Sequence, residues 1–145
     1  MLSNLDAGSV VNKYFKIKIE KLTSASTSAS ISTSTKKKNK SEANRVLEKY
    51  PDRVPVLVTK NQYSSTTPEI DKQKFLVPVD ITMGQLLYVI RKRLQLHPEK
   101  GLFLFIYGNM ISNHELVGIV YQQSHDREDC FLHVVYGCES VFGGT

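Results

Sequence analysis

The sequence predicts an α+β fold, and three observations lead to that class. Apolar, β-branched runs at 54–60, 74–80, 102–108 and 130–137 have the composition of buried strands. Between the second and third runs, residues 82–96 repeat apolar side chains at helical spacing. Hydrophobic residues make up 41% of the 145-residue chain, which is enough for a single modest core. The chain is therefore expected to form one small domain with extensions.

The segment before this domain divides into two parts. Residues 1–22 contain "FKIKIEK" (15–21), whose alternation suits a strand, although Val11, Phe15 and Leu22 would also share one face of a helix. Ten of the thirteen residues from Thr23 to Thr35 are Ser or Thr, and "KKKNK" follows. Such a composition cannot bury enough apolar surface to offset its ordering entropy. Residues 23–41 are therefore expected to be a disordered linker.

The first element expected beyond that linker is a short amphipathic helix, "SEANRVLEKY" (41–50). Ser41 is its predicted N-cap, and Val46, Leu47 and Tyr50 are predicted to face inward. The strand runs at 54–60 and 74–80 come next, separated by a polar loop as in a hairpin.

The main helix, predicted over 82–96, has clear start and stop signals. Thr82 and Gln85 form a capping box, and His97-Pro98 ends the helix. Its apolar positions at helical spacing are Met83, Leu86, Leu87, Ile90 and Leu94.

A second, short helix is predicted over 113–123 with Asn113 as its cap, between the strands at 102–108 and 130–137. The order is thus strand, strand, long helix, strand, short helix, strand. A hairpin, a helix across the sheet and a last strand returning to the centre define the β-grasp of ubiquitin-like proteins. A ferredoxin-like α+β sheet is the competing arrangement.

Charge is distributed unevenly along the chain. Residues 1–41 carry eight lysines against Asp6 and Glu20, so they contribute +6 to a total of +5. The folded part is therefore close to neutral, which removes the electrostatic basis for specific nucleic-acid binding. A membrane or nucleic-acid tether made by the lysines of residues 1–41 remains an alternative hypothesis.

The cysteines and histidines suggest no active site or metal centre. Cys130 and Cys138 are too few for a disulfide framework, and the chain shows no secretory signal, so a reduced compartment is expected. Cys130 is predicted to be a small buried hydrophobe in a strand. "HDRED" (125–129) is interpreted as a solvated turn. The four histidines lack metal-ligand spacing, so no metal or cofactor is predicted.

Four longer stretches carry a family resemblance. "EKYPDRVPVLV", "PEIDKQKFLVPVDITMGQLLYVIRKRL", "PEKGLFLFIYGN" and "GCESVFG" closely resemble the autophagy ubiquitin-like modifiers, the GABARAP and microtubule-associated-protein light-chain-three family. The similarity runs from about Glu42 to Gly143. It implies a ubiquitin-like domain over 42–137, including its preceding helix, and a processing tail over 138–145. It also implies a modifier rather than an enzyme.

The resemblance assigns chemistry to the closing "ESVFGGT". In the family a cysteine protease cuts after a glycine that follows an aromatic residue, here Phe142 and Gly143. E1-like and E2-like enzymes then carry the new carboxylate as a thioester to phosphatidylethanolamine. Gly144 offers a second possible cut, and cleavage after Gly143 is preferred. The mature protein is thus expected in the cytoplasm and, through its covalent lipid, on autophagosomal membranes.

The resemblance also implies a groove for short aromatic-x-x-aliphatic motifs of cargo receptors and adaptors. The strand at 74–80 is predicted to be a sheet edge, because Pro78 cannot donate to a central ladder. The implied aromatic pocket comprises Glu42, Val46, Pro55, Leu57, Lys74, Leu76 and Phe131. The implied aliphatic pocket comprises Phe75, Val77, Pro78, Ile81, Leu86 and Val89. Acidic residues flanking the motif are expected to be attracted by Arg53, Lys72, Lys74 and Arg91.

The alternative from a different class is a ubiquitin-like module that binds peptides in this groove and is never conjugated. The fate of the tail separates the two hypotheses.

Overall fold

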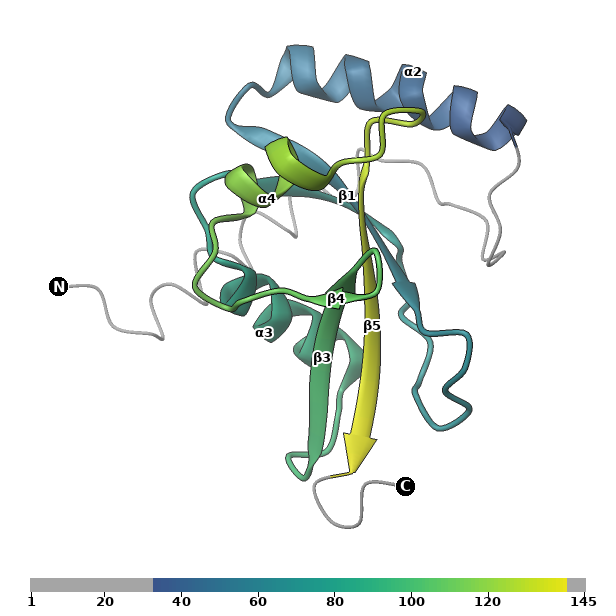
Figure 1. Ribbon diagram of the computed structural model, residues 1–145, viewed down its shortest axis with the longest axis vertical. Coiled ribbons are helices and arrows are strands. Elements are labelled where there is room, and N and C mark those ends of the chain that lie inside the picture. Colours follow the sequence, from purple (N-terminus) through teal and green to yellow (C-terminus); the bar gives the residue numbers. More distant parts are fainter. Residues whose placement is uncertain (1–32, 141–145) are drawn as a thin grey trace, which may run out of the picture.

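The computed structural model describes residues 33–140, and Figure 1 labels the elements. In chain order these are α2 (Thr33–Lys49), β1 (Arg53–Lys60), β2 (Lys74–Pro78), α3 (Met83–Leu94), β3 (Lys100–Ile106), β4 (Asn109–Met110), α4 (Val117–Ser124) and β5 (Leu132–Ser140). The predicted order of strands and helices is confirmed, with the two-residue β4 added.

The five strands form one mixed sheet in the order β2-β1-β5-β3-β4. β1 and β5 are parallel neighbours, whereas β2 pairs antiparallel with β1, and β3 pairs antiparallel with both β5 and β4. The last strand therefore lies in the centre, as in the predicted β-grasp. β5 begins beside α2 and runs the length of the molecule to the end where the C-terminus is marked (Figure 1).

The main core lies between α3 and one face of the sheet. Leu86 and Ile90 of α3 are fully buried there against alternate residues of the central strands, including Val56 and Val134. The predicted capping box is confirmed: Thr82 accepts a hydrogen bond from the Gln85 N–H at 3.2 Å, and the Gln85 side chain accepts one from the Thr82 N–H at 2.9 Å.

The opposite face of the sheet is covered by α2. Ala43 of this helix packs with Leu57 and Phe131, and Val46 packs with Leu76. Because side chains alternate along a strand, β1 and β2 send one set to α3 and the other to α2.

The predicted start of the first helix is wrong. α2 begins at Thr33, so residues 33–41 of the expected linker are helical and Ser41 lies inside the helix rather than at its N-cap. The additional turns make a tertiary contact that the local sequence does not encode: Lys36 Nζ lies 2.6 Å from a Glu128 carboxylate oxygen and 3.4 Å from one of Asp126. Residues 1–22 and the rest of the linker, 23–32, lie outside the described residues.

The predicted cap of the second short helix is also wrong, because Leu116 rather than Asn113 precedes α4. Backbone bonds to α3 hold the intervening residues in a non-helical path. The Asn113 carbonyl accepts from the Gly84 N–H at 3.0 Å, and the Glu115 carbonyl accepts from the Met83 N–H at 2.8 Å. Both donors are in the first turn of α3, whose N–H groups lack partners within the helix.

No helix among residues 33–140 has the length and apolarity needed to cross a membrane.

Replacing Gly118 by alanine is expected to destabilise the fold. A Cβ at Gly118 would lie 2.8 Å from the Val79 Cβ and 3.0 Å from the Val79 carbonyl oxygen. Overpacking of this kind costs about 1–3 kcal/mol, of which the better helix propensity of alanine offsets about 1 kcal/mol. The midpoint of urea unfolding should therefore fall.

Gly137→Ala is the matched control, because a Cβ there meets nothing closer than 3.8 Å. Equal unfolding midpoints for the two variants would contradict the close packing of α4 against the residue after β2.

Candidate functional site

The outer edge of β2 is the candidate functional site. Within residues 33–140, β2 pairs with β1 alone. The Val58 N–H donates to the Gln73 carbonyl at 2.7 Å, which sets the phase of the antiparallel ladder. Since bonded pairs alternate in such a ladder, Lys74 and Leu76 direct their backbone N–H and C=O groups away from β1. Among the strands that the structure describes, these outward main-chain groups of β2 bond to no partner strand, and the predicted edge position is confirmed.

The structure brings the predicted aromatic-pocket residues together between α2 and β1–β2. All seven are buried: Glu42, Val46, Pro55, Leu57, Lys74, Leu76 and Phe131. Leu76 is only 1% exposed because Val46 and Tyr50 pack against it. Within the described residues, Val46 and Tyr50 are thus the apolar side chains of the α2 side that pack with Leu76. Tyr50 was not among the predicted pocket residues, although its spacing from Val46 on one helix face was a usable signal.

A buried ion pair links α2 to β2 inside this cluster. Lys74 Nζ lies 2.8 Å from Glu42 Oε2, and the two side chains are 4% and 5% exposed. The ammonium also lies 5.6 Å from the centre of the Phe131 ring. Charges this deeply buried are tolerated because they are paired. The pair ties the aromatic cluster together and neutralises Lys74.

Most of the predicted aliphatic-pocket residues lie on the α3 side of the sheet. Five of them belong to the main core next to α3: Phe75, Val77, Ile81, Leu86 and Val89. Pro78, also buried, ends β2. Phe75 is additionally covered by the Arg93 guanidinium, which lies 5.6 Å from its ring centre. These side chains stabilise the fold, independently of any contact with a bound peptide.

The predicted contacts for an acidic flank lie in different environments. Lys72 is exposed, whereas Arg53 is 8% exposed with its guanidinium 3.8 Å from the Asp52 carboxylate. Arg91 donates to the Lys100 carbonyl at 2.7 Å. Together with the neutralised Lys74, these contacts leave Lys72 as the exposed cation of the predicted set.

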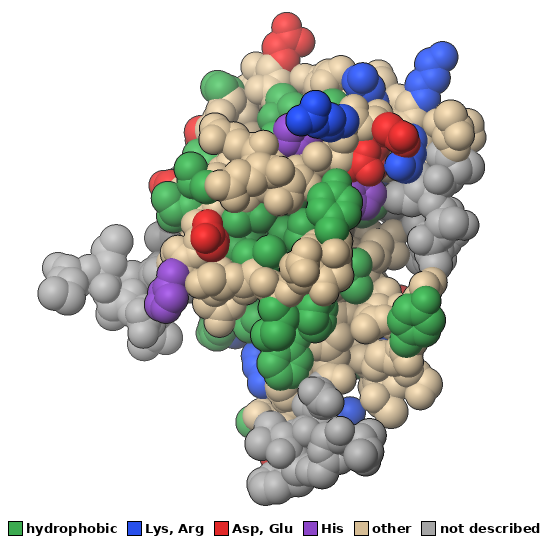
Figure 2. Space-filling model, viewed as in Figure 1, with side chains coloured by type: hydrophobic (Ala, Val, Ile, Leu, Met, Phe, Trp, Pro, Cys, Tyr) green, Lys and Arg blue, Asp and Glu red, His purple; other side chains and the backbone are tan. Residues whose placement is uncertain are grey.

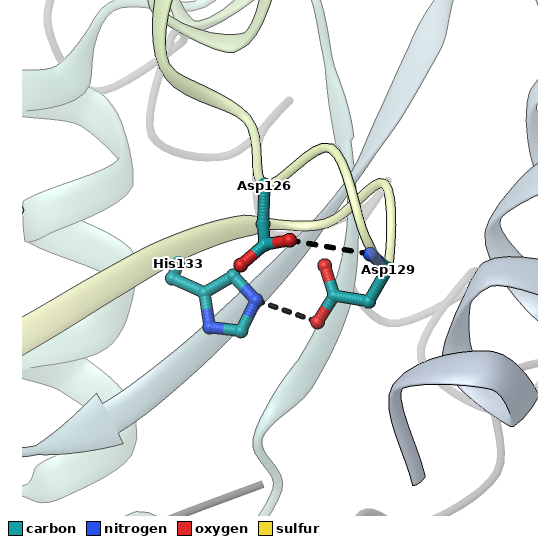
Figure 3. Close-up of side chains that lie close together, drawn as sticks. All are labelled: Asp126, Asp129 and His133. Atoms are coloured by element: carbon teal, nitrogen blue, oxygen red, sulfur yellow. Dashed lines mark hydrogen bonds and ion pairs between the residues drawn. The ribbon is translucent and has the colours of Figure 1, made fainter. Parts of the chain in front are cut away.

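A second polar cluster precedes β5 and includes residues that we predicted to form a solvated turn. Asp129 is fully buried; it accepts from the Phe131 N–H at 2.9 Å and lies 2.7 Å from His133 Nε2 (Figure 3). Asp126 accepts from the N–H groups of Glu128 and Asp129 at 2.7 and 3.3 Å. The turn is therefore built around an inward carboxylate, and the predicted solvation is wrong for Asp129.

Burial opposes ionisation of Asp126, but the two backbone N–H donors and the Lys36 ammonium outweigh it and lower its pKa. Ligand atoms of Asp126, Asp129 and His133 lie within 4.8 Å of one another, so these are the described residues that could hold a metal ion. Their carboxylates already have partners within the turn and in α2. Figure 2 shows acidic and basic side chains interleaved at this end of the molecule.

Cys138 does not have the setting of a nucleophile. Burial raises the pKa of the Cys138 thiol, which disfavours the reactive thiolate. Cys130 lies in the turn before β5 with a φ of 62°, so its predicted place in a strand is wrong.

The predicted cleavage and lipidation residues, Phe142, Gly143 and Gly144, lie outside the described residues. They follow β5, whose last residue is Ser140 at the end of the molecule remote from α2 (Figure 1).

The sheet order, the crossing helix and the additional N-terminal helix define a ubiquitin-like protein of the β-grasp class. Comparison with known proteins identifies the family. The sequence profile described as "Autophagy protein Atg8 ubiquitin like" matches residues 38–143. The chain therefore belongs to the Atg8 family of autophagy ubiquitin-like proteins, whose members are modifiers.

Plant relatives are similar over most of their length. Autophagy-related protein 8e of Arabidopsis thaliana is 48% identical over 105 residues, covering 72% of this chain and 84% of that protein. Autophagy-related protein 8B of Oryza sativa subsp. indica is 47% identical over 103 residues, covering 71% and 85%.

A solved structure is also similar. The crystal structure of Trypanosoma brucei ATG8 aligns with a TM-score of 0.68 at 37% identity, covering 75% of this chain and 92% of that one.

The Glu42–Lys74 pair can be tested by a double-mutant cycle. Glu42→Leu or Lys74→Met alone should destabilise the protein by about 3–5 kcal/mol, because each leaves a buried charge without its partner. The double variant should recover most of this loss, since apolar side chains of similar volume replace both ions. Free energies of urea unfolding measure the cycle. Additive losses in the double variant would contradict direct coupling between the two side chains.

Proposed function

We propose that this protein is a conjugated Atg8-type modifier that docks extended peptides along β2. The observation that carries the docking proposal is the position of β2: an open sheet edge with α2 on one face and α3 on the other. A peptide added as a further strand would bond to the outward groups of Lys74 and Leu76. Main-chain bonds would supply affinity, and the two faces would supply specificity.

This geometry favours an aromatic-x-x-aliphatic motif. Side chains three residues apart on a strand point to opposite faces. One of them would meet the α2 side near Leu76 and Val46, and the other the α3 side near Val77. Receptors and adaptors with such motifs are the proposed partners, and opening of Val46 and Tyr50 is the proposed adjustment that admits the aromatic ring.

The tail completes the proposed function. Hydrolysis of the Gly143–Gly144 peptide bond would release Gly144-Thr145 and leave the Gly143 carboxylate. An E1-like partner would activate that carboxylate with ATP as an acyl adenylate, releasing pyrophosphate, and its cysteine thiol would then displace AMP to form a thioester. An E2-like partner would take over the glycyl group by thiol exchange. The amine of phosphatidylethanolamine would attack the thioester carbonyl, forming an amide and releasing the thiol. Glycine suits this step because it has no Cβ to obstruct a narrow channel or the attacking amine. Two acyl chains would anchor the domain stably to autophagosomal membrane, whereas one chain binds only marginally.

The docking proposal predicts a strict dependence on motif spacing. A labelled peptide with Trp and Leu three residues apart should bind, and its binding should shift the backbone amide resonances of Lys74 and Leu76. A peptide of the same composition with Trp and Leu two residues apart should bind at least tenfold more weakly, since both side chains would then point to one face. Fluorescence polarisation measures both affinities. Equal affinities would contradict docking as an added strand.

The conjugation proposal predicts that Gly143→Ala abolishes the lipid conjugate. The variant is incubated with cell extract and vesicles containing phosphatidylethanolamine, and intact mass reports the C-terminus. We expect at least a tenfold loss of conjugate, because the alanine methyl group would obstruct the narrow channel in which the processing and conjugating enzymes would bind the C-terminal glycine.

A chain prepared to end at Gly143 is the matched control and should be conjugated without the protease. If Gly143→Ala were conjugated at the normal rate, Gly143 would not be the residue that carries the lipid. If the unmodified chain were not trimmed and the chain ending at Gly143 were not conjugated, the results would favour the alternative, a peptide-binding module that is never conjugated.

A further inference from the structure

We infer that the protein regulates its own β2 edge: residues 14–17, Tyr-Phe-Lys-Ile, dock on the edge of the same molecule and compete with partner peptides. This inference rests on the docking site proposed above. It concerns which occupant holds the edge when no partner is present.

The chain contains three matches to an aromatic residue followed three positions later by Ile, Leu or Val. Phe103–Ile106 lies within β3, and Phe131–Val134 runs into β5, so the backbone of both is used in the sheet. Tyr14–Ile17 is the third match and precedes the described domain. It is the match that can be offered to an edge without dismantling the fold.

The residues around this match suit an added strand. "YFKIKIEK" (14–21) alternates apolar and charged side chains after Tyr14, with β-branched Ile17 and Ile19. In an extended chain Tyr14 points to one face, and Ile17 points to the opposite one. These are the two directions that lead from the β2 edge to the α2 side and the α3 side.

Charge also favours this occupant. The segment carries Lys13, Lys16, Lys18 and Lys21 against Glu20. Exposed carboxylates lie at both ends of β2: Asp52 and Asp80 near Pro78, and Asp71 near Lys74. Two of them also have a cation beside them within the domain, since Asp52 lies 3.8 Å from the Arg53 guanidinium and Asp71 lies 2.7 Å from that of Arg93.

Glu42 already neutralises Lys74, the cation within the edge itself. A basic strand is therefore repelled less at this edge than it would be if Arg53, Lys72, Lys74 and Arg91 were all exposed and unpaired cations.

The connecting chain has the length that this docking needs. Fifteen residues, 18–32, separate Ile17 from Thr33, the first residue of α2. Glu42 contacts Lys74 at the start of β2, and Thr33 lies nine residues earlier, about 14 Å along the helix. A flexible chain of fifteen residues spans about 20 Å root-mean-square. The length of this connection is thus close to the distance that it has to cover. The effective concentration of a linked ligand is highest when these two lengths match.

Competition of this kind lowers the apparent affinity for partner peptides without blocking them. An effective concentration of about 1 mM, acting on a segment that binds with a Kd of about 0.1 mM, weakens an external peptide about tenfold. A receptor that presents several motifs, or a partner that binds residues 1–32, would relieve the competition.

The test compares full-length proteins carrying Tyr14→Ala with Ile17→Ala, Leu22→Ala, or neither change. Leu22→Ala is the matched control, because it removes an apolar side chain from the same segment outside the motif. The probe is a labelled peptide with Trp and Leu three residues apart, and fluorescence polarisation measures its Kd. We expect the double variant to bind about tenfold more tightly than the other two. Without the probe, the amide resonances of Lys74 and Leu76 in the double variant should also differ in position from those of the unchanged protein.

The other outcomes separate the two proposals. Equal Kd values for all three proteins would overturn the self-docking inference and leave the peptide site intact. Absence of probe binding in every protein would overturn the proposed peptide site, and the inference with it. A tightening that disappears on dilution of the protein would show that the occupant is a second copy, which also overturns docking within one chain.

Discussion

The parallel pairing of β1 with β5 fixes where the other elements can lie. Parallel neighbours cannot be joined by a tight turn, so the chain between them must include a crossover connection. α3 makes that crossing on one face and supplies the core with Leu86 and Ile90. Once β5 occupies one side of β1, β2 has only the other side, where it becomes the edge. The candidate binding strand is thus a consequence of how the two central strands pair.

This arrangement gives the two faces of β2 different roles. On the α3 side, Phe75 and Val77 belong to the main core, so they contribute mainly to stability. On the α2 side, Leu76 contacts a small separate cluster with Val46 and Tyr50, joined to the rest by the Glu42–Lys74 pair. A small cluster on a terminal helix can open at less cost than the main core, because fewer buried contacts are lost. Adjustment to a peptide is therefore expected at α2.

The two proposed activities lie at opposite ends of the molecule. β5 starts beside α2 and ends at Ser140, from which the tail continues (Figure 1). A lipid attached to the tail would hold that end at the membrane and leave the α2 end facing away from it. The same strand that completes the core would therefore separate the proposed anchoring site from the proposed peptide-binding edge.

Local patterns predicted most of the fold, because they concern residues that are neighbours along the chain. The Thr82–Gln85 capping box, the strand runs and Pro78 in an edge strand all act within a few positions. The two helix starts were mispredicted where distant contacts decided. α2 extends back to Thr33 with Lys36 paired to Asp126 and Glu128, about ninety residues away. α4 starts late because its leading residues bond to α3.

The candidate site divides in the same way. Local sequence was enough to predict the edge strand, the near-neutral charge of the domain and the family resemblance that names the pocket and tail residues. The folded arrangement was needed to show that Glu42 neutralises Lys74, that Tyr50 packs against Leu76, and that Asp129 is buried beside His133. Burial and pairing of a charge depend on side chains that the sheet brings together from distant positions, and no local spacing encodes that proximity.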